Sequence, residues 1–324
     1  MDLMSRCIEI AALGEREVSP NPMVGCVIAN GSEIKAEGYH EYYGGPHAEV
    51  NALSKLEDPT GCTLYVSLEP CAHFGKTPPC VQRIINSGIK KVVIGALDPK
   101  NGGGAKILRD HGIDVTTGVL EEKVKEQNFR FFCGAKKNRP YIILKWAESS
   151  DGFIAPLNKE RVYLSSESSN LEVHKWRSKE AGILVGSETV LIDNPKLDTR
   201  LVKGRNPCRI ALDRRRRLLN NRALNIFNPT APVILFGYDE AVIDGYIYTF
   251  PENDIEAILK RVLDFGIDSV IVEGGGQILN SFLPFYDELR VIRTAKKLGS
   301  GIRAPLSISE EVCIDSDLIF TKKR

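Results

Sequence analysis

Apolar and polar positions in the first 135 residues follow two different periods. Residues 1–14 carry apolar side chains at three- and four-residue spacing, which predicts an amphipathic helix ending at Gly14. Residues 24–29, 63–68 and 91–97 are short apolar runs bounded by turn residues, which is typical of buried strands. Further helices, the first two opened by prolines, are expected over residues 46–56, 79–88, 105–111 and 121–132. Strands that alternate with helices predict an α/β layer fold.

The same alternation resumes after a basic segment that ends in a proline, at residues 136–140. Strands are expected over residues 141–144, 181–185, 209–212, 233–236 and 269–272. Helices are expected over residues 168–179, 187–192, 254–265 and 277–282. We therefore place a domain boundary within the basic segment and expect two domains, residues 1–138 and 139–324.

Composition fits two folded domains and excludes several classes of protein. The chain has 324 residues, 43% of them hydrophobic and 26% charged, so it is neither disordered nor a coiled coil. A formal net charge of +1 gives no field that would hold nucleic acid or an acidic membrane surface. No apolar run approaches the ~20 residues of a membrane-spanning helix, and no signal peptide is recognised. A cytoplasmic location is therefore expected. That the protein is a homo-oligomer and acts on a small-molecule substrate are separate expectations, which do not follow from composition.

One histidine and two cysteines lie at the ends of predicted elements. Most of the eight cysteines are expected to be core residues, but His47, Cys71 and Cys80 form a three-ligand zinc set that leaves a fourth position to water. Two thiolates neutralise Zn²⁺, so the bound water needs a nearby base, and Glu49 is expected to be that proton shuttle. Each residue alone would be explained as a cap, a solvated acid or a core thiol. Together they favour a catalytic zinc site.

The zinc motif resembles that of the cytidine deaminase superfamily, with His-Ala-Glu at residues 47–49 followed by Pro-Cys and a second cysteine. Eight residues separate the two cysteines, and this longer insert, with the segments at residues 19–25 and 44–49, is similar to the bifunctional riboflavin-biosynthesis deaminase/reductase family. The resemblance implies an N-terminal cytidine-deaminase-like three-layer α/β/α domain that hydrolytically deaminates a phosphoribosylated diaminopyrimidine. It also implies that the substrate is held by Asn21, His40, His73, Lys76 and Asp98.

The second half resembles the reductase half of the same family, through residues 145–152, 181–190, 193–200 and 273–276. The resemblance implies a dihydrofolate-reductase-like α/β domain in which NADPH reduces the ribose of the deaminated product to a ribityl chain. The implied cofactor contacts are Glu148, Tyr163, Thr189, Asp193, Gly275, Gly276 and Gln277. The implied sugar-phosphate contacts are Arg177, Leu197, Arg200 and Glu273.

Three residues depart from the family pattern in the second half. Arg161 and Arg214 stand where the family has serine, and Tyr163 stands where it has tryptophan. Each arginine either adds a phosphate contact or fills the pocket, so a deaminase whose second half is only a scaffold is the alternative. The basic run at residues 214–217 is interpreted as a solvated turn and not as a nucleic-acid patch.

Two other classes of protein fit the sequence less well. A nucleic-acid base deaminase would need a basic stripe and the shorter P-C-x-x-C spacing, and the sequence has neither. A purely structural zinc site would need a fourth protein ligand, for which His73 is the candidate in the sequence.

Overall fold

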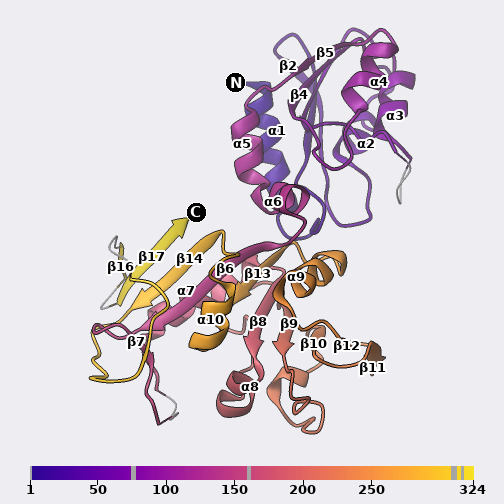
Figure 1. The fold of residues 1–324 in the computed structure, drawn as a ribbon. Helices are drawn as coiled ribbons and strands as arrows, with labels where there is room; N and C mark the ends of the chain where they lie inside the picture. Colours follow the sequence, from indigo (N-terminus) through magenta and orange to yellow (C-terminus); the bar gives the residue numbers. More distant parts are fainter. Residues whose placement is uncertain (1, 74–77, 159–161, 308–311, 315–316) are drawn as a thin grey trace. The chain divides into compact units, whose positions relative to one another are not determined.

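The structure is a computed structural model that describes residues 2–73, 78–158, 162–307, 312–314 and 317–324. The chain divides into two compact units, Met1–Asn138 and Arg139–Arg324 (Figure 1). Each unit contains its own sheet and its own buried apolar cluster.

The first unit follows the strand and helix alternation of its sequence. Its elements are α1 (Leu3–Ala11), η1 (Ala12–Gly14), β1 (Gly25–Asn30), β2 (Glu33–Tyr39), α2 (Ala48–Leu53), β3 (Thr63–Leu68), α3 (Cys80–Asn86), β4 (Lys91–Ala96), α4 (Gly104–Asp110), β5 (Asp114–Thr117), α5 (Glu121–Gln127) and α6 (Phe129–Lys137). Among the described residues, the sheet has the order β2-β1-β3-β4-β5, with β1 antiparallel to both neighbours and β3, β4 and β5 parallel.

Helices cover both faces of this sheet, which makes three layers (Figure 1). Alternate strand residues point to opposite faces. Ile28 and Leu64 pack beneath α2, α3 and α4, whereas Val27 and Val93 pack beneath α1. The three-layer α/β/α arrangement predicted from the sequence is therefore confirmed.

The close packing of α2 on β2 depends on Gly38. A Cβ atom at this position would lie 2.4 Å from the backbone nitrogen of Ala52 and 2.6 Å from the carbonyl oxygen of Ala48. Both are backbone atoms of α2, so they could not move aside without moving the helix. The hydrogen atom of glycine thus allows α2 to lie directly on the sheet.

Two helix predictions in this unit were wrong in their bounds. The helix expected over residues 46–56 spans only Ala48–Leu53, because Pro46 precedes His47, which caps the helix in an extended conformation. The helix expected over residues 121–132 is two helices that meet at Asn128. The Asn128 side chain accepts a hydrogen bond from the Met23 N–H (2.8 Å) and donates one to the Met23 carbonyl (3.0 Å), which anchors the junction.

The second unit is built on a larger sheet. Its elements are β6 (Tyr141–Glu148), β7 (Phe153–Ala155), α7 (Glu167–Lys179), β8 (Gly182–Gly186), α8 (Ser187–Asp193), β9 (Cys208–Leu212), η2 (Asn225–Phe227), β10 (Val233–Phe236), β11 (Ala241–Ile243), β12 (Ile247–Phe250), α9 (Ile255–Asp264), β13 (Ser269–Val272), α10 (Gly276–Phe282), β14 (Glu288–Arg293), β15 (Ile302–Arg303), β16 (Val312–Ile314) and β17 (Asp317–Lys323).

Over the described part of this unit, the main sheet has the order β11-β12-β10-β9-β8-β13-β6-β14-β17-β16. The strands from β12 to β14 are parallel, and β11, β17 and β16 pair antiparallel at the two edges. A short β7–β15 pair forms a separate sheet. Helices α9 and α10 pack on one face through Ile258, Val262, Leu279 and Phe282.

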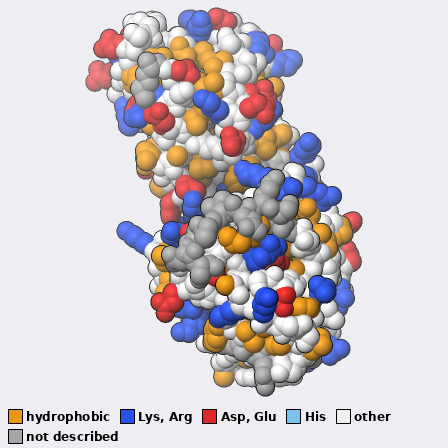
Figure 2. All heavy atoms as spheres, turned by 90° about the vertical axis from the view of Figure 1, so that its left-hand side faces the viewer, with side chains coloured by type: hydrophobic (Ala, Val, Ile, Leu, Met, Phe, Trp, Pro, Cys, Tyr) orange, Lys and Arg blue, Asp and Glu red, His pale blue; other side chains and the backbone are white. Residues whose placement is uncertain are grey.

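Three further features of the structure concern the length of its helices, its cysteines and its surface charge. None of the helices in the described part of the chain is long and apolar enough to cross a membrane. None of the seven cysteines whose side chains are described forms a disulfide, and all except Cys71 are buried, as expected of mostly core residues. On the face that Figure 2 shows, lysine and arginine side chains lie among acidic and apolar ones.

Candidate functional site

Three potential metal ligands of the first unit converge where β3, α2 and α3 end or begin. His47 is the N-cap of α2, Cys71 lies just beyond the end of β3, and Cys80 is the first residue of α3. Their ligand atoms all lie within 4.8 Å of one another. His47 Nδ1 is 3.2 Å from Cys80 Sγ and 3.5 Å from Cys71 Sγ. One imidazole and two thiols at this separation fit a zinc ion that keeps one coordination position open.

The two thiols of this cluster differ in their affinity for a proton. The Cys80 backbone N–H donates a hydrogen bond to Cys71 Sγ at 3.3 Å. Hydrogen bonds from Cys80 and His47, opposed by burial, lower the pKa of Cys71 to about 4. The pKa of Cys80 is raised for two reasons. Its thiol is hydrogen-bonded to Cys71, which favours the protonated form of Cys80, and burial disfavours the charged thiolate. At least one thiolate is therefore ready to bind a metal.

Glu49 lies in the first turn of α2, and only 3% of its surface is exposed. Burial raises the pKa of its carboxyl group, although the charge of His47 opposes the effect. The carboxyl also interacts with the Cys80 thiol. A carboxyl group with a raised pKa beside the metal ligands can take up and release a proton, as a general acid–base must.

Asn21 and His40 extend this site on the side of His47. Asn21 Nδ2 lies 3.1 Å from His40 Nε2, and His40 Nδ1 lies 3.0 Å from the Pro46 carbonyl oxygen. The rings of His40 and His47 are edge to face, with centroids 5.4 Å apart. Burial lowers the pKa of His40, so the ring is neutral and donates to Pro46 while Nε2 accepts from Asn21. The structure thus brings together six of the predicted residues: the three metal ligands, Glu49, Asn21 and His40.

The remaining predicted substrate contacts are His73, Lys76 and Asp98. His73 is exposed and is not part of the metal-ligand group found among the described residues. Lys76 lies outside the described residues. Asp98 Oδ1 accepts hydrogen bonds from the backbone N–H groups of Lys100 and Asn101, which gives it a local role in a turn.

Sequence reasoning missed Glu69, which is 7% exposed and directly precedes Pro70 and Cys71. Its carboxylate accepts hydrogen bonds from the N–H groups of Asp98 (3.1 Å), Gly103 (3.0 Å) and Ala105 (2.8 Å). These bonds join the end of β3 to the loop between β4 and α4. The only indication in the sequence was that Glu69 directly follows a predicted strand. That position does not distinguish a buried glutamate that binds backbone N–H groups from one exposed to solvent.

A buried ion-pair cluster in the second unit contains two of the predicted sugar-phosphate residues. Arg177 of α7 donates to both carboxylate oxygens of Glu273, at 2.8 and 2.7 Å. Lys145 Nζ lies 3.7 Å from the same carboxylate. Lys145 of β6 stands between Leu144 and Trp146, which pack under α9 and α10, so it points to the opposite face. The strand pattern gave no reason to place Lys145 in a site.

The charges of this cluster stabilise each other. Burial would raise the pKa of Glu273, but Arg177 and Lys145 outweigh it and hold that pKa at about 2. Burial lowers the pKa of Lys145, and the charge of Glu273 opposes this effect. The cluster therefore holds two basic side chains and one carboxylate away from water. Their electric field on a bound ligand is stronger there than it would be in solvent.

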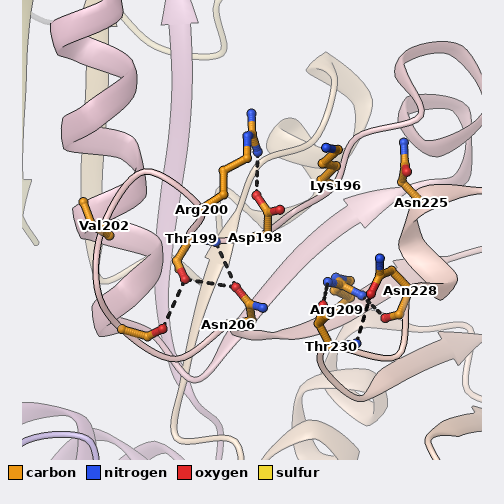
Figure 3. A pocket seen from close by; sticks show the side chains of 11 residues that line it. Lys196, Asp198, Thr199, Arg200, Val202, Asn206, Arg209, Asn225, Asn228 and Thr230 are labelled. Carbon is orange, nitrogen blue, oxygen red and sulfur yellow. Dashed lines mark hydrogen bonds and ion pairs between the residues drawn. The ribbon is translucent and has the colours of Figure 1, made fainter.

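Arg200 and Leu197 lie in the loop after α8, next to this cluster. Arg177 Nη1 donates to the Asp198 carbonyl at 3.4 Å, and Arg200 pairs with the Asp198 carboxylate at 2.5 Å. Leu197 is buried in a left-handed conformation (φ 51°). Arg200 and Asp198 also line a polar cavity of about 360 Å³ (Figure 3). Its other walls include Lys196, Thr199, Val202, Gly204, Asn206, Arg209, Asn225, Asn228 and Thr230.

The predicted cofactor residues lie mainly where two neighbouring strands end. α8, with Thr189 and Asp193, follows β8. The glycine triplet, residues 274–276, follows the adjacent strand β13. A Cβ atom on Gly275 would meet nothing within 4 Å, so open space lies over this backbone, and Gln277 beside it is exposed. Ligands of parallel α/β sheets bind at this edge, so these residues fit a dinucleotide.

Two other predicted cofactor contacts are placed differently. Both carboxylate oxygens of Glu148 are already used, one by Trp146 Nε1 and one by Arg293 Nε, each at 2.8 Å. Tyr163 is 66% exposed, and its carbonyl accepts a hydrogen bond from Lys296. The contacts that the structure shows for Glu148 and Tyr163 are with other residues and not with the glycine triplet.

Of the departures from the family pattern, Arg161 lies outside the described residues. Arg214 is exposed at a turn after β9, and its guanidinium donates to the Asn253 carbonyl at 2.5 Å. Arg216 pairs with Asp239 (3.1 Å) and Arg217 with Glu188 (2.7 Å). The basic run thus begins as an exposed turn, as predicted.

Comparison with known proteins links both units to one group of proteins. Residues 1–96 match the family described as "Cytidine and deoxycytidylate deaminase zinc-binding region", and residues 140–313 match "RibD C-terminal domain". The riboflavin biosynthesis protein RibD of Aquifex aeolicus is 38% identical over 321 residues, covering 92% of this chain and 88% of that protein. The RibD of Actinobacillus pleuropneumoniae is 38% identical over 328 residues, covering 96% and 87%.

Solved structures resemble the chain over both units. The crystal structure of a diaminohydroxyphosphoribosylaminopyrimidine deaminase/5-amino-6-(5-phosphoribosylamino)uracil reductase from Thermotoga maritima has a TM-score of 0.86 and 39% identity. The match covers 99% of this chain and 97% of the Thermotoga maritima chain. Acinetobacter baumannii RibD has a TM-score of 0.86 and 30% identity, covering 98% of this chain and 96% of its own.

Proposed function

Because this chain belongs to the RibD family of riboflavin-biosynthesis enzymes, we propose how its two units divide the work of deaminase and reductase. The protein is an enzyme with both activities, and a deaminase with an inactive second half is not favoured. Its first unit has the cytidine-deaminase-like fold and its second the dihydrofolate-reductase-like fold. We assign deamination to residues 1–138 and reduction to residues 139–324.

In the first unit, we infer that His47, Cys71 and Cys80 hold zinc, which when bound supplies Lewis-acid activation of water. Glu49 takes one proton from the attacking water and passes it to the pyrimidine ring nitrogen, and then takes the second proton of the same oxygen and passes it to the departing amine. The reaction replaces an amino group by a carbonyl and releases ammonia. Asn21 and His40 line the same site and are assigned to binding of the pyrimidine.

In the second unit, we assign the dinucleotide to Thr189, Asp193 and the segment from Gly275 to Gln277. NADPH supplies the hydride when bound. Arg177 and Arg200 are assigned to the phosphate of the sugar, because a guanidinium group offers several donors to a phosphate dianion. Leu197 and Glu273 complete this site. A cytoplasmic location and a homo-oligomeric assembly stay predictions, as do the roles of Glu148, Tyr163, His73, Lys76 and Asp98.

The observation that carries this proposal is the convergence of three zinc-type ligands next to a buried glutamate. It is tested by giving zinc-loaded protein the phosphoribosylated diaminopyrimidine while ammonia and NADPH absorbance are followed together. Ammonia should be released with or without NADPH, and NADPH should be oxidised only after ammonia release has begun. Ammonia without any loss of NADPH would remove the reductase assignment. NADPH loss without ammonia would remove the deaminase.

A further inference from the structure

The second unit contains a buried histidine that the proposed mechanism does not use. His174 lies on α7 and is 3% exposed. It is three residues before Arg177, so the two side chains share a side of the helix. It is also the only histidine in residues 139–324. A single histidine buried beside a substrate-binding arginine is a candidate for function.

Within the described structure, His174 Nδ1 is buried and has no hydrogen-bond partner. Buried polar atoms are nearly always paired, and an unpaired one destabilises the folded protein. The charged groups that act on this imidazole are Arg177 on α7, Arg200 and Asp198 on the loop after α8, and Glu273 after β13. Three of these four residues are those assigned to the sugar-phosphate site.

We propose that His174 belongs to the sugar-phosphate site of the reductase and takes up a proton when a phosphate ester binds there. This inference rests on the proposed function, which places the phosphate at Arg177 and Arg200. It adds a titrating residue to that site and makes binding of the substrate a proton-linked event.

Electrostatics gives the direction of the change. Burial, with the charges of Arg177 and Arg200, lowers the pKa of His174 to about 4, so the imidazole is neutral near pH 7. Asp198 and Glu273 oppose this effect and do not overcome it. A phosphate dianion offsets the two guanidinium charges and attracts a proton to the ring. This attraction raises the pKa of His174, so the ring binds more protons with the phosphate ester present than without it.

The reduction itself consumes a proton. When the sugar ring opens, the bond between C1′ and the ring oxygen breaks, and the oxygen keeps the electron pair and gains a proton to become a hydroxyl. The glycosidic nitrogen forms a double bond to C1′, which then accepts the hydride of NADPH. A protonated His174 would bring the required proton into the site together with the substrate.

Histidine-selective NMR titration of the full-length, zinc-loaded protein tests this inference. The His174 signal is assigned by its loss in His174→Gln, and its midpoint is measured alone and with ribose 5-phosphate. The midpoint should rise by at least 1 pH unit with ribose 5-phosphate and stay unchanged with ribose, which has no phosphate. Binding of ribose 5-phosphate with no change in the midpoint would overturn the proposal.

A second measurement separates this inference from the function on which it rests. If ribose 5-phosphate does not bind at all, the sugar-phosphate site itself is wrong, and the inference is wrong with it. If it binds, His174→Gln should lower the reductase kcat/KM about tenfold and change its pH profile, while Kd for NADPH and ammonia release stay the same. Lys175→Gln, at an exposed neighbour on α7, should change none of these. An unchanged pH profile in His174→Gln would also overturn the proposal.

Discussion

Glu49 shows how one side chain can be prepared for proton transfer by its surroundings. It lies in the first turn of a short helix, yet 3% exposure leaves its carboxyl almost without water. Burial disfavours the charged form, and nearby His47 favours it. These opposing effects bring the protonated and ionised forms closer in free energy than they are in water. A group that passes a proton in both directions needs that balance.

The first prediction concerns this carboxyl group. Glu49→Gln keeps the shape of the side chain but removes the group that accepts a proton, so zinc content should stay the same. Ammonia release should fall by a factor of about 10²–10⁴, the usual contribution of a general acid–base. Metal analysis and an ammonia assay measure the two effects, with Glu9→Gln, at an exposed carboxylate of α1, as the matched control. Turnover near the wild-type rate would exclude the shuttle role.

At the residue scale, sequence reasoning found the groups that form a motif and missed those that form contacts. His47, Cys71 and Cys80 could be predicted because zinc chemistry restricts both the residue types and their placement. Glu69 and Lys145 could not, because their importance comes from partners far away in the sequence. Glu69 binds backbone groups of Gly103 and Ala105, and Lys145 meets a carboxylate that follows another strand.

At the scale of elements, the position of α2 fixes both His47 and Glu49. The helix has only six residues, too few to be stable without packing. Its support is β2, which it meets at Gly38 without an intervening side chain. The geometry of the metal ligands therefore depends on a glycine that touches none of them.

A second prediction follows for Gly38→Ala. The new Cβ would lie 2.4 Å from the Ala52 nitrogen, so α2 must move away from the sheet. We expect a loss of about 1–3 kcal/mol in stability, typical of overpacking, and weaker zinc retention because His47 moves with the helix. Urea unfolding and metal analysis report the two effects. Lys35→Ala, a substitution on the same strand with a partly exposed side chain, is the control. Wild-type stability and zinc content would show that the helix position is not restricted by this contact.

Strands and helices were predicted best where the local pattern decides the structure. β3, β10 and β13 have the predicted bounds, because continuous apolar runs between turns leave few alternatives. The break between α5 and α6 was missed, because Asn128 stops the helix by bonding to Met23, 105 residues away. Such a tertiary contact leaves no periodic signal in the sequence.

At the scale of the whole molecule, the two assigned reactions depend on different chemistry. The metal ligands belong to the first unit, and the ion-pair cluster and glycine triplet belong to the second. Each unit has its own buried core, so the loss of a metal from one does not remove packing from the other.

Removal of zinc should therefore separate the two activities. Protein treated with a chelator should release no ammonia from the diaminopyrimidine and, for lack of product, should oxidise no NADPH. The same protein given the already deaminated substrate should oxidise NADPH at an undiminished rate. Zinc added back should restore ammonia release, which controls for damage by the chelator. Loss of NADPH oxidation with the deaminated substrate would show that the units are coupled through the metal.

The two-part organisation could be read from the sequence, but the extent of the second sheet could not. Its central parallel strands are apolar runs, whereas its antiparallel strands include β11 at one edge, an exposed strand of three residues, and the partly polar β17, which is next to last at the other. Antiparallel strands can face water on one side, so their apolar pattern is weaker. The pairing of β17 with β14 depends on the side chains of both strands, so it cannot be predicted from either segment alone.

The hydrogen bonds between the two cysteine positions have a consequence for how the chain can vary. The N–H groups of Cys80 and Val81 donate to the sulfur and the carbonyl of Cys71, each at 3.3 Å. The end of β3 and the start of α3 are thus joined by the backbone itself. The segment that connects them in sequence does not have to hold the ligands at their distance. A change in the length or composition of that segment is therefore expected to leave the two ligand positions where they are.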